Sequence, residues 1–280
     1  MPELPEVETV RRGLEQLVVG KTIIGTEVRW EKTISGMAPE LFNQALAGKR
    51  ILNIKRRGKY LIFNFTGELS MVSHLRMEGA YYTVPEGTQP GKHDLVTFHL
   101  DDGTDLFYRD TRKFGRMVLI DSDKVMTVGG LATIGPEPTE QTLTLDYMID
   151  EFKHSKTRLK PFLLDQKHIA GLGNIYVDET LWQSKLHPKT PANLVSVTEL
   201  AELRKNIINE LARATEHHGT TIHSFTNAFG GAGGFQNELQ VYGRVGEPCL
   251  RCGTPLEKIK VAQRGTTFCP VCQVERSKDD

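Results

Sequence analysis

The 280-residue sequence has no excess of either charge, because 35 lysines and arginines balance 35 aspartates and glutamates. Proteins that bind polyanions over a whole face are usually basic, so any nucleic-acid surface here is expected to be a local patch. The sequence also lacks an apolar run near the roughly 18 residues that a membrane helix needs. Its first eight residues carry three glutamates, which is the wrong charge for a secretory signal. We therefore expect a cytoplasmic protein with no membrane segment.

Cysteine is scarce as well, since the chain has four and none precedes residue 249. They form two Cys-x-x-Cys pairs, Cys249 with Cys252 and Cys269 with Cys272. Disulfides rarely persist in the cytosol, whereas paired knuckles at this separation are typical of one structural zinc ion in a tetrahedral site. Four unrelated thiols are the alternative, which the spacing disfavours. Arg264 lies between the pairs at an expected hairpin turn, where it could reach a phosphate or simply face solvent.

The first half of the chain reads as mostly β-structure. Val7, Val10, Leu14 and Leu17 share one face at helical spacing, which predicts a helix over residues 3–18. β-Branched and aromatic runs bounded by turn residues follow, with a small helix between them. The strands predicted are 22–30, 50–56, 59–65, 69–75, 95–100, 105–109 and 116–120, and the small helix is 39–47. These elements indicate a β-sandwich with flanking helices.

The second half reads as helical. The run Gly135-Pro136-Glu137-Pro138-Thr139 interrupts regular structure. Short helices are predicted over 158–165 and 174–185, and Ser196 with Glu199 makes a capping box for a helix to about residue 215. The expected fold class is α+β with several domains. The boundaries expected are 1–134 for the sandwich, 135–235 for a helical domain and 236–280 for the cysteine-bearing module.

Two basic clusters without acidic residues suit local neutralisation of phosphates. They cover residues 49–59 and 153–160. Gly171-Leu172-Gly173 followed by Asn174 would present backbone amides to a phosphate, although ordinary helix capping explains the run as well. Each cluster alone is more often a solvated surface. Together with the cysteine pairs, the clusters favour a nucleic-acid surface.

Residues 74–78, with Arg112 and Phe114, mix apolar and cationic side chains of the kind that wedge between bases. Nothing in the sequence shows that these residues converge. As residues without an assigned role, Met77 and Phe114 would more often belong to a hydrophobic core.

Pro2 becomes the N-terminal residue once the initiator methionine is removed. An α-amino group has an unperturbed pKa of about 7.7–8.0, against roughly 10.4 for lysine, so more of it is neutral at pH 7. Attack of this secondary amine on a sugar C1′ would give an iminium ion directly. Glu3 is adjacent and could transfer the proton that such a reaction needs. From the residues alone, however, Pro2 is better explained as the residue that precedes a helix.

Several segments resemble bacterial formamidopyrimidine-DNA glycosylase, the family that excises 8-oxoguanine. They are MPELPEVETVRRGL, RRGKY, SHLRMEG, RDTRKFG, LDQKHIAGLGNIYVDE, ELQVYGR and the paired knuckles, and they span the chain in order. The resemblance implies a β-sandwich, a helix–two-turn–helix domain and a zinc ribbon. It also implies a bifunctional hydrolase and lyase. Such an enzyme removes 8-oxoguanine and formamidopyrimidine bases from duplex DNA and then nicks the strand by β,δ-elimination.

The resemblance assigns roles to residues. Pro2 would be the nucleophile that forms a Schiff base, and Glu3 the proton donor supported by Glu6. Lys59 would assist β-elimination, and Arg264 would grip a phosphate during δ-elimination. The residues expected to contact DNA are His74, Met77, His93, Arg112, Phe114, Lys156, Lys160, Asn174 and Tyr242. Met77, Arg112 and Phe114 would fill the gap left by the flipped nucleotide, and residues 219–234 resemble the loop that closes over it.

The implied partner is double-stranded DNA with oxidised purines or abasic sites, bound by a monomer at the bacterial nucleoid. Three alternatives stay open. An endonuclease VIII-like enzyme for oxidised pyrimidines would begin MPEGPE rather than MPELPE. A non-catalytic sensor of damaged DNA would be expected to lose Pro2, Glu3 or Lys59. The cysteine module could also serve only as a protein-interaction element.

Overall fold

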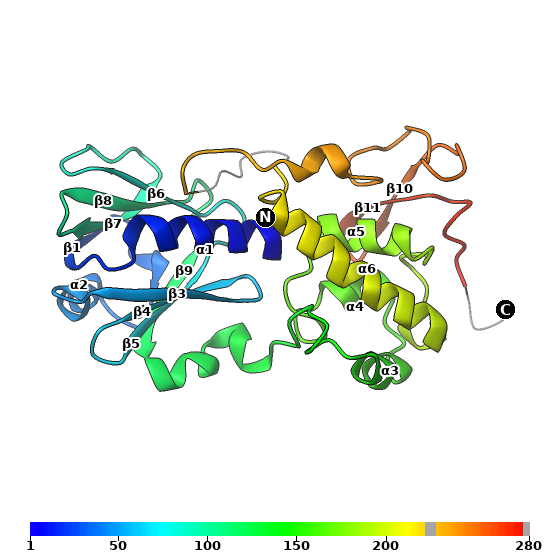
Figure 1. The fold of residues 1–280 in the computed structure, drawn as a ribbon, viewed down its shortest axis with the longest axis horizontal. Helices are drawn as coiled ribbons and strands as arrows, with labels where there is room; N and C mark the ends of the chain where they lie inside the picture. The colour runs from blue at the N-terminus through cyan, green and yellow to red at the C-terminus, as the bar shows by residue number, and fades with distance from the viewer. Residues whose placement is uncertain (222–227, 277–280) are drawn as a thin grey trace. The chain divides into compact units, whose positions relative to one another are not determined.

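The computed structural model describes residues 1–221 and 228–276. The chain divides into two compact units, residues 1–132 with 217–234 and residues 133–216 with 235–280. The first unit is rich in strands and the second is mostly helical (Figure 1). Residues 217–234 cluster with the strands in this division, whereas the sequence prediction groups them with the helices. The three-domain boundaries therefore remain a prediction.

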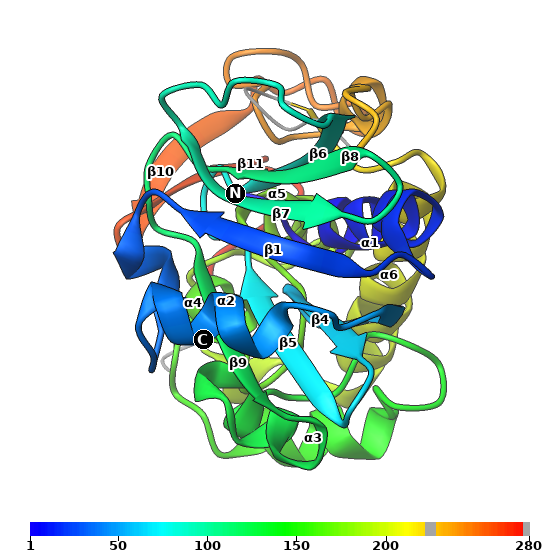
Figure 2. The same cartoon turned by 90° about the vertical axis from the view of Figure 1, so that its left-hand side faces the viewer.

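The described part of the first unit holds two β-sheets. Its strands are β1 Ile23–Val28, β2 Ile34–Ser35, β3 Ile51–Arg57, β4 Tyr60–Phe65, β5 Leu69–His74, β6 Ala80–Pro85, β7 Asp94–Leu100, β8 Thr104–Arg109 and β9 Arg116–Asp121. One sheet has the order β1–β7–β8–β6 and the other β2–β9–β5–β4–β3. β2 and β9 are parallel, and the other neighbours are antiparallel. Figure 2 shows β1, β7 and β8 apart from β4, β5 and β9.

Side chains from both sheets form one core. Phe63 of β4 and Tyr81 of β6 come from different sheets, and their ring centroids lie 5.5 Å apart. Because successive side chains of a strand point to opposite faces, β4 presents Leu61, Phe63 and Phe65 to this core. The predicted β-sandwich is therefore confirmed.

Helix α1 (Leu4–Val18) lies against the sandwich and contacts β3, β4 and β6, so it touches both sheets. Its buried face carries Val7, Val10 and Leu14 of the predicted stripe. Each fully buried aliphatic side chain stabilises the fold by about 1.5–3 kcal/mol. This packing fixes the helix, and with it the N-terminal residues that precede it. A second helix, α2 (Pro39–Leu46), contacts β1.

The second unit is built from helices and a β-hairpin. Its main elements are α3 Leu145–Lys153, α4 Leu159–Leu164, α5 Asn174–Gln183, α6 Val197–Glu216, β10 Glu257–Val261 and β11 Arg264–Phe268. The predicted capping box before α6 is confirmed, because the Ser196 N–H donates to Glu199 Oε2 at 2.9 Å. The part of the chain that the structure describes contains no helix long and apolar enough to cross a membrane.

The sequence did not reveal β2, β6 or α3. β2 has two residues, and β6 buries only Tyr81, so neither shows the alternation that marks a strand. α3 buries Met148 and Phe152 alone, which is too short a pattern to be recognised. Its start is nevertheless capped, since the Tyr147 N–H donates to Thr144 Oγ1 at 3.2 Å.

The predicted position of Arg264 in the hairpin turn is wrong. The turn consists of Ala262 and Gln263, both with positive φ (45° and 64°), and Arg264 pairs with Val261 as the first residue of β11. Two-residue turns of this kind usually contain Asn or Gly, so Ala-Gln gives no sequence signal. Arg264 is exposed, as a phosphate contact requires.

Candidate functional site

The N-terminal residues are packed into the first unit. Pro2 is buried, and Glu3 is 2% exposed. The Glu3 N–H donates to Glu6 Oε2 at 2.8 Å, while Glu6 Oε1 accepts from the Thr220 N–H at 2.7 Å. One carboxylate thus joins the start of α1 to the segment beginning at residue 219. Gly219 has a φ of 77°, which favours glycine, and a Cβ there would lie 2.7 Å from Glu6 Oε1. Residues 222–227 of the predicted lesion loop lie outside the described residues.

Lys59 lies in the two-residue turn between β3 and β4, after Gly58, whose φ is 54°. A positive φ of this kind favours glycine. Lys59 is only 4% exposed. A buried ammonium group is costly unless its surroundings compensate it, which is a common condition for a lysine that takes part in chemistry.

His74 ends β5, where its ring meets Tyr60 edge-on with centroids 4.6 Å apart. Its Nδ1 accepts the Arg76 N–H at 2.9 Å, which places its own proton on Nε2. Burial, and then the charges of Arg76 and Lys59, lower the pKa of His74 to about 3. His74 is therefore neutral at pH 7 and cannot contribute charge to phosphate binding.

The lowered pKa of His74 predicts a loss of stability in mild acid. Below about pH 6.5, His74 takes up a proton in the unfolded state but stays neutral in the native state. The free energy of unfolding therefore decreases as the pH is lowered, until His74 is also protonated in the native state at about pH 3. The slope is about 1.4 kcal/mol per pH unit, or at most ~2 kcal/mol between pH 6.5 and 5. We expect His74→Asn to remove this part of the fall in urea denaturation at pH 7 and pH 5. The same change at exposed His154 serves as the control. Equal falls in wild type and His74→Asn would contradict the assignment.

Asp110 organises the loop that carries Arg112 and Phe114. It is fully buried, its Oδ1 accepts from the Arg112 N–H at 2.9 Å, and its Oδ2 accepts from the Gly115 N–H at 2.7 Å. The guanidinium carbon of Arg112 lies 5.0 Å from the centre of the Phe114 ring. Phe114 is 49% exposed, so it is not a core residue. Sequence reasoning missed Asp110, although Asp commonly bonds the backbone of a turn that follows it.

Met77 and His93 also belong to the first unit. Met77 is partly buried, three residues after the end of β5. The His93 carbonyl accepts from the Asp110 N–H at 2.9 Å, which ties it to the Arg112 loop. The buried Nδ1 of His93 has no hydrogen-bond partner within residues 1–221 and 228–276. Such atoms are rare in folded proteins, and water or a bound molecule would satisfy this one.

Gly115→Ala is expected to destabilise the protein by about 1–3 kcal/mol, because overpacking a well-filled site has this cost. The new methyl group would overlap the Tyr108 hydroxyl and lie 2.8 Å from its ring carbon Cζ. Urea denaturation measures the loss, and Gly25→Ala is the matched control. Its methyl would meet nothing closer than 3.7 Å, so a change within about 0.5 kcal/mol is expected. Equal stability of the two variants would show that the loop carrying Arg112 can shift to accommodate the methyl group without a loss of folding free energy.

In the second unit, Lys160 and Asp178 attach the β-hairpin to the helices. The Lys160 ammonium is fully buried and donates to Asp178 Oδ1 at 2.6 Å and to the Gly265 carbonyl at 2.9 Å. Asp178 Oδ2 accepts from the Thr267 N–H at 3.0 Å. Lys160 is therefore not at the surface, in contrast to its predicted direct contact with DNA. Its hydrogen bonds stabilise the position of β11 instead. Lys156, by comparison, is exposed.

Asn174 is the first residue of α5, and Gly173 is the N-cap, so Asn174 does not cap the helix. Its Nδ2 donates to the Gly265 carbonyl at 3.2 Å. Its buried Oδ1 has no hydrogen-bond partner in the described part of the chain. Asn174 therefore lies beside the hairpin residue that follows Arg264, with one polar atom unsatisfied.

Glu179 is a further buried carboxylate that sequence reasoning missed. It accepts from the backbone N–H groups of Gln240, Val241 and Tyr242 at 2.8, 3.0 and 2.8 Å. Burial raises the pKa of Glu179 to about 7, against the opposing effect of these donors. The contact fixes the segment that carries Tyr242, one of the predicted DNA contacts. Two adjacent acidic residues, Asp178 and Glu179, in a helix with no other charged residue were the available signal.

The cysteines converge as predicted. The Sγ atoms of Cys249, Cys252, Cys269 and Cys272 all lie within 4.8 Å of one another. Four thiolate ligands at such separations fit a tetrahedral zinc ion. Trp182 packs beside them, and its indole N–H donates to Cys249 Sγ at 3.4 Å.

Family models match in three consecutive parts of the chain. Residues 1–117 match the formamidopyrimidine-DNA glycosylase N-terminal domain, residues 134–226 its H2TH domain, and residues 246–274 the zinc finger found in FPG and IleRS. The formamidopyrimidine-DNA glycosylase of Lactiplantibacillus plantarum is 61% identical over 273 residues, which cover 98% of this chain and 99% of that protein. The chain belongs to the formamidopyrimidine-DNA glycosylase family. The Pediococcus pentosaceus member is 58% identical, over 99% of this chain and all of that protein.

Solved structures of the family agree with the fold. A Lactococcus lactis FPG mutant in complex with DNA containing Fapy-dG has a TM-score of 0.93 and 44% identity. The superposed residues cover 98% of this chain and 100% of the Lactococcus lactis chain. The complex of Lactococcus lactis Fpg with abasic-site DNA gives the same values. As a formamidopyrimidine-DNA glycosylase, the chain is a base-excision repair enzyme, and abasic-site lyase activity is general to the family.

Family membership also settles the metal. The cysteine cluster is the family's zinc finger and holds one structural zinc ion, as predicted. The residues predicted for the chemistry fall into two groups. Pro2, Glu3, Glu6 and Lys59 lie in the first unit, and Arg264 lies in the second.

Proposed function

We propose that this enzyme removes 8-oxoguanine and formamidopyrimidine bases through its N-terminal proline. The Pro2 nitrogen forms a bond to C1′ while the bond from C1′ to the base breaks, and the departing base takes the bonding electrons. Glu3 supplies the proton that this step consumes. Glu3, now a carboxylate, takes the N–H proton from the Pro2 nitrogen and passes it to O4′ as the C1′–O4′ bond breaks, while the nitrogen lone pair forms the C=N bond of an iminium ion. The iminium ion acidifies C2′, and loss of a C2′ proton to a base expels the 3′ phosphate by β-elimination.

The observation that carries the proposal is the fixation of the N-terminus. Buried Pro2 and Glu3 precede a helix packed on both sheets, and Glu6 holds the Glu3 amide with one oxygen and the Thr220 amide with the other. Reacting groups held in this way need little reorganisation. In the same proposal, Lys59 assists elimination and exposed Arg264 binds the phosphate that leaves in the δ step.

We extend the proposal to the DNA. The Lactococcus lactis relatives were solved with Fapy-dG and abasic-site DNA, and we assign duplex DNA with such lesions to this chain. Met77, Arg112 and Phe114 would occupy the gap in the duplex, which suits an exposed aromatic ring beside a guanidinium. His93, Lys156, Asn174 and Tyr242 would contact the backbone. We propose that the enzyme acts as a monomer at the nucleoid, within the cytoplasm.

Borohydride trapping tests the catalytic proposal. Wild-type protein should form a covalent adduct with an abasic-site duplex, and absence of the adduct would favour a non-catalytic damage sensor. Single-turnover excision should be at least about tenfold faster from 8-oxoguanine·cytosine than from thymine-glycol duplexes, a difference of about 1.4 kcal/mol in the barrier. Oxidised pyrimidines are the second candidate substrate, because Lactococcus lactis Fpg was also solved with such DNA.

A further inference from the structure

The basic cluster at residues 49–59 is not a uniform phosphate surface. Arg56 belongs to it, yet its Nε donates to Glu8 Oε2 at 3.0 Å, and its side chain is 16% exposed. Glu8 lies on α1, and its side chain is 14% exposed. The cluster therefore directs one of its arginines inward, onto the helix that begins at the catalytic N-terminus.

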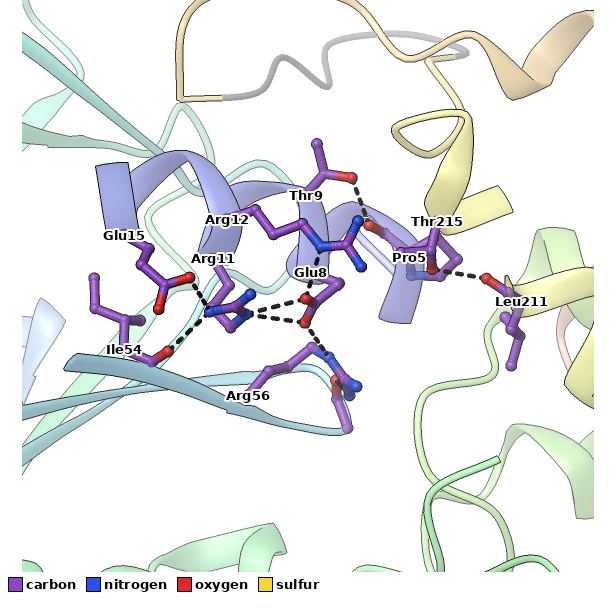
Figure 3. A network of polar contacts seen from close by, with 11 residues as sticks. Pro5, Glu8, Thr9, Arg11, Arg12, Glu15, Ile54, Arg56, Leu211 and Thr215 are labelled. Atoms are coloured by element: carbon purple, nitrogen blue, oxygen red, sulfur yellow. Dashed lines mark hydrogen bonds and ion pairs between the residues drawn. The ribbon is translucent and has the colours of Figure 1, made fainter. Parts of the chain in front are cut away.

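Glu8 is the centre of a network that Figure 3 shows from close by. Its oxygens also accept from Arg11 Nε at 3.1 and 3.2 Å and from Arg12 Nε at 3.0 Å. Burial alone would raise the pKa of Glu8, but the charges of Arg11 and Arg56 outweigh burial and lower it. Glu8 is thus a stable anion, and it holds three guanidinium groups in fixed positions.

Arg56 connects Glu8 to the β3–β4 turn. Its NH1 donates to the Gly58 carbonyl at 3.1 Å, and Gly58 immediately precedes Lys59. A guanidinium is planar, so fixing its Nε at Glu8 also fixes the direction in which NH1 points. Arg11 adds a second attachment to β3, because its NH1 donates to the Ile54 carbonyl at 3.3 Å. The turn that carries Lys59 is therefore tied to the helix that follows Pro2.

We propose that Glu8 is a positioning residue for Lys59, acting through Arg56 and the Gly58 carbonyl. The inference rests on the role proposed above for Lys59, and it names Glu8 as the residue that positions Lys59. Both side chains of the Glu8–Arg56 pair are largely buried, so the geometry of the pair is closely held. The consequence for activity is geometric, since a displacement of about 1 Å at a reacting group can slow a reaction roughly hundredfold.

Glu8→Gln tests the proposal, because the amide keeps the shape and loses the charge. We expect single-turnover cleavage of an abasic-site duplex to slow by about tenfold to hundredfold. The Kd for a tetrahydrofuran-site duplex should stay within about twofold, or 0.4 kcal/mol. Glu15→Gln is the matched control, since Glu15 lies on the same helix and accepts from Arg11 NH1 at 2.7 Å. Its cleavage rate should equal that of wild type.

A double-mutant cycle separates positioning from general destabilisation. In a Lys59→Met background, Glu8→Gln or Arg56→Gln should have almost no further effect, because their shared target is gone. Multiplicative losses in that background would overturn the inference, as would an unchanged rate in Glu8→Gln alone. If Lys59→Met itself leaves the rate unchanged, the proposed role of Lys59 fails instead. Arg56→Gln provides the same test should Glu8→Gln fail to fold.

Discussion

A form of this enzyme with residues in front of Pro2 should bind abasic-site DNA normally and lose base excision by about a thousandfold or more, the scale seen when a covalent nucleophile is removed. The physical reason is local to one atom. Once Pro2 is acylated, its nitrogen belongs to an amide, and its lone pair is delocalised into the carbonyl group. Such a nitrogen cannot attack C1′ or form an iminium ion.

The structure indicates that this loss would not come from misfolding. Met1 is 49% exposed although Pro2 behind it is buried, so a preceding residue does not disturb the packing of α1. Retained Met1 and a protease-cleavable extension are the two forms to compare. Excision, borohydride trapping and the Kd for DNA are measured for each form. Cleavage back to Pro2 should restore activity, and an adduct formed by the extended chain would remove Pro2 from the mechanism.

The parts of this fold that were predictable are those with local causes. The stripe of Val7, Val10 and Leu14 marked α1 because a helix needs one apolar face to pack. The strands of the sandwich had alternating apolar and polar residues or were apolar throughout. The spacing of the cysteines predicted the zinc site. Each signal is contained within a few neighbouring residues, so no knowledge of the rest of the chain was needed.

The side-chain contacts that were missed depend on partners distant in sequence. Glu179 bonds backbone groups 61 to 63 residues away, and Glu8 meets Arg56 across 48 residues. The sequence shows a carboxylate in each case but not what it faces. Lys160 is the clearest example, because a lysine in a basic cluster suggests a surface, while its real partner is a buried Asp178. The role proposed for Pro2 was likewise invisible without the family resemblance.

Removal of the zinc ion should weaken DNA binding by about a hundredfold or more while the β-sandwich of the first unit stays folded. The core around the cysteines consists, among the described residues, of Trp182, Val241, Cys249, Leu256 and Cys269. So small a core cannot hold a hairpin by burial alone. A structural zinc ion supplies about 10–16 kcal/mol of apparent binding energy, which here serves as folding energy for the hairpin.

The loss of binding follows from what the hairpin carries. Arg264 begins β11, and the next carbonyl, that of Gly265, is held by both Lys160 and Asn174. Without zinc the Gly265 carbonyl is no longer held in place, so the proposed phosphate contact of Arg264 and the orientation of Asn174 should be lost together. Fluorescence polarisation of labelled duplex DNA during chelation measures the effect, and added zinc should reverse it.

Trp182 offers an internal reporter of the same event. Its indole N–H donates to Cys249 Sγ, and the Arg251 guanidinium lies 3.9 Å from its ring centre. The chain has two tryptophans, so Trp30→Phe leaves Trp182 as the sole indole signal. We expect its fluorescence to change in step with zinc release and loss of DNA binding, while far-UV circular dichroism keeps the sheet signal. A sheet that melts together with the Trp182 signal would show instead that the metal stabilises the whole chain.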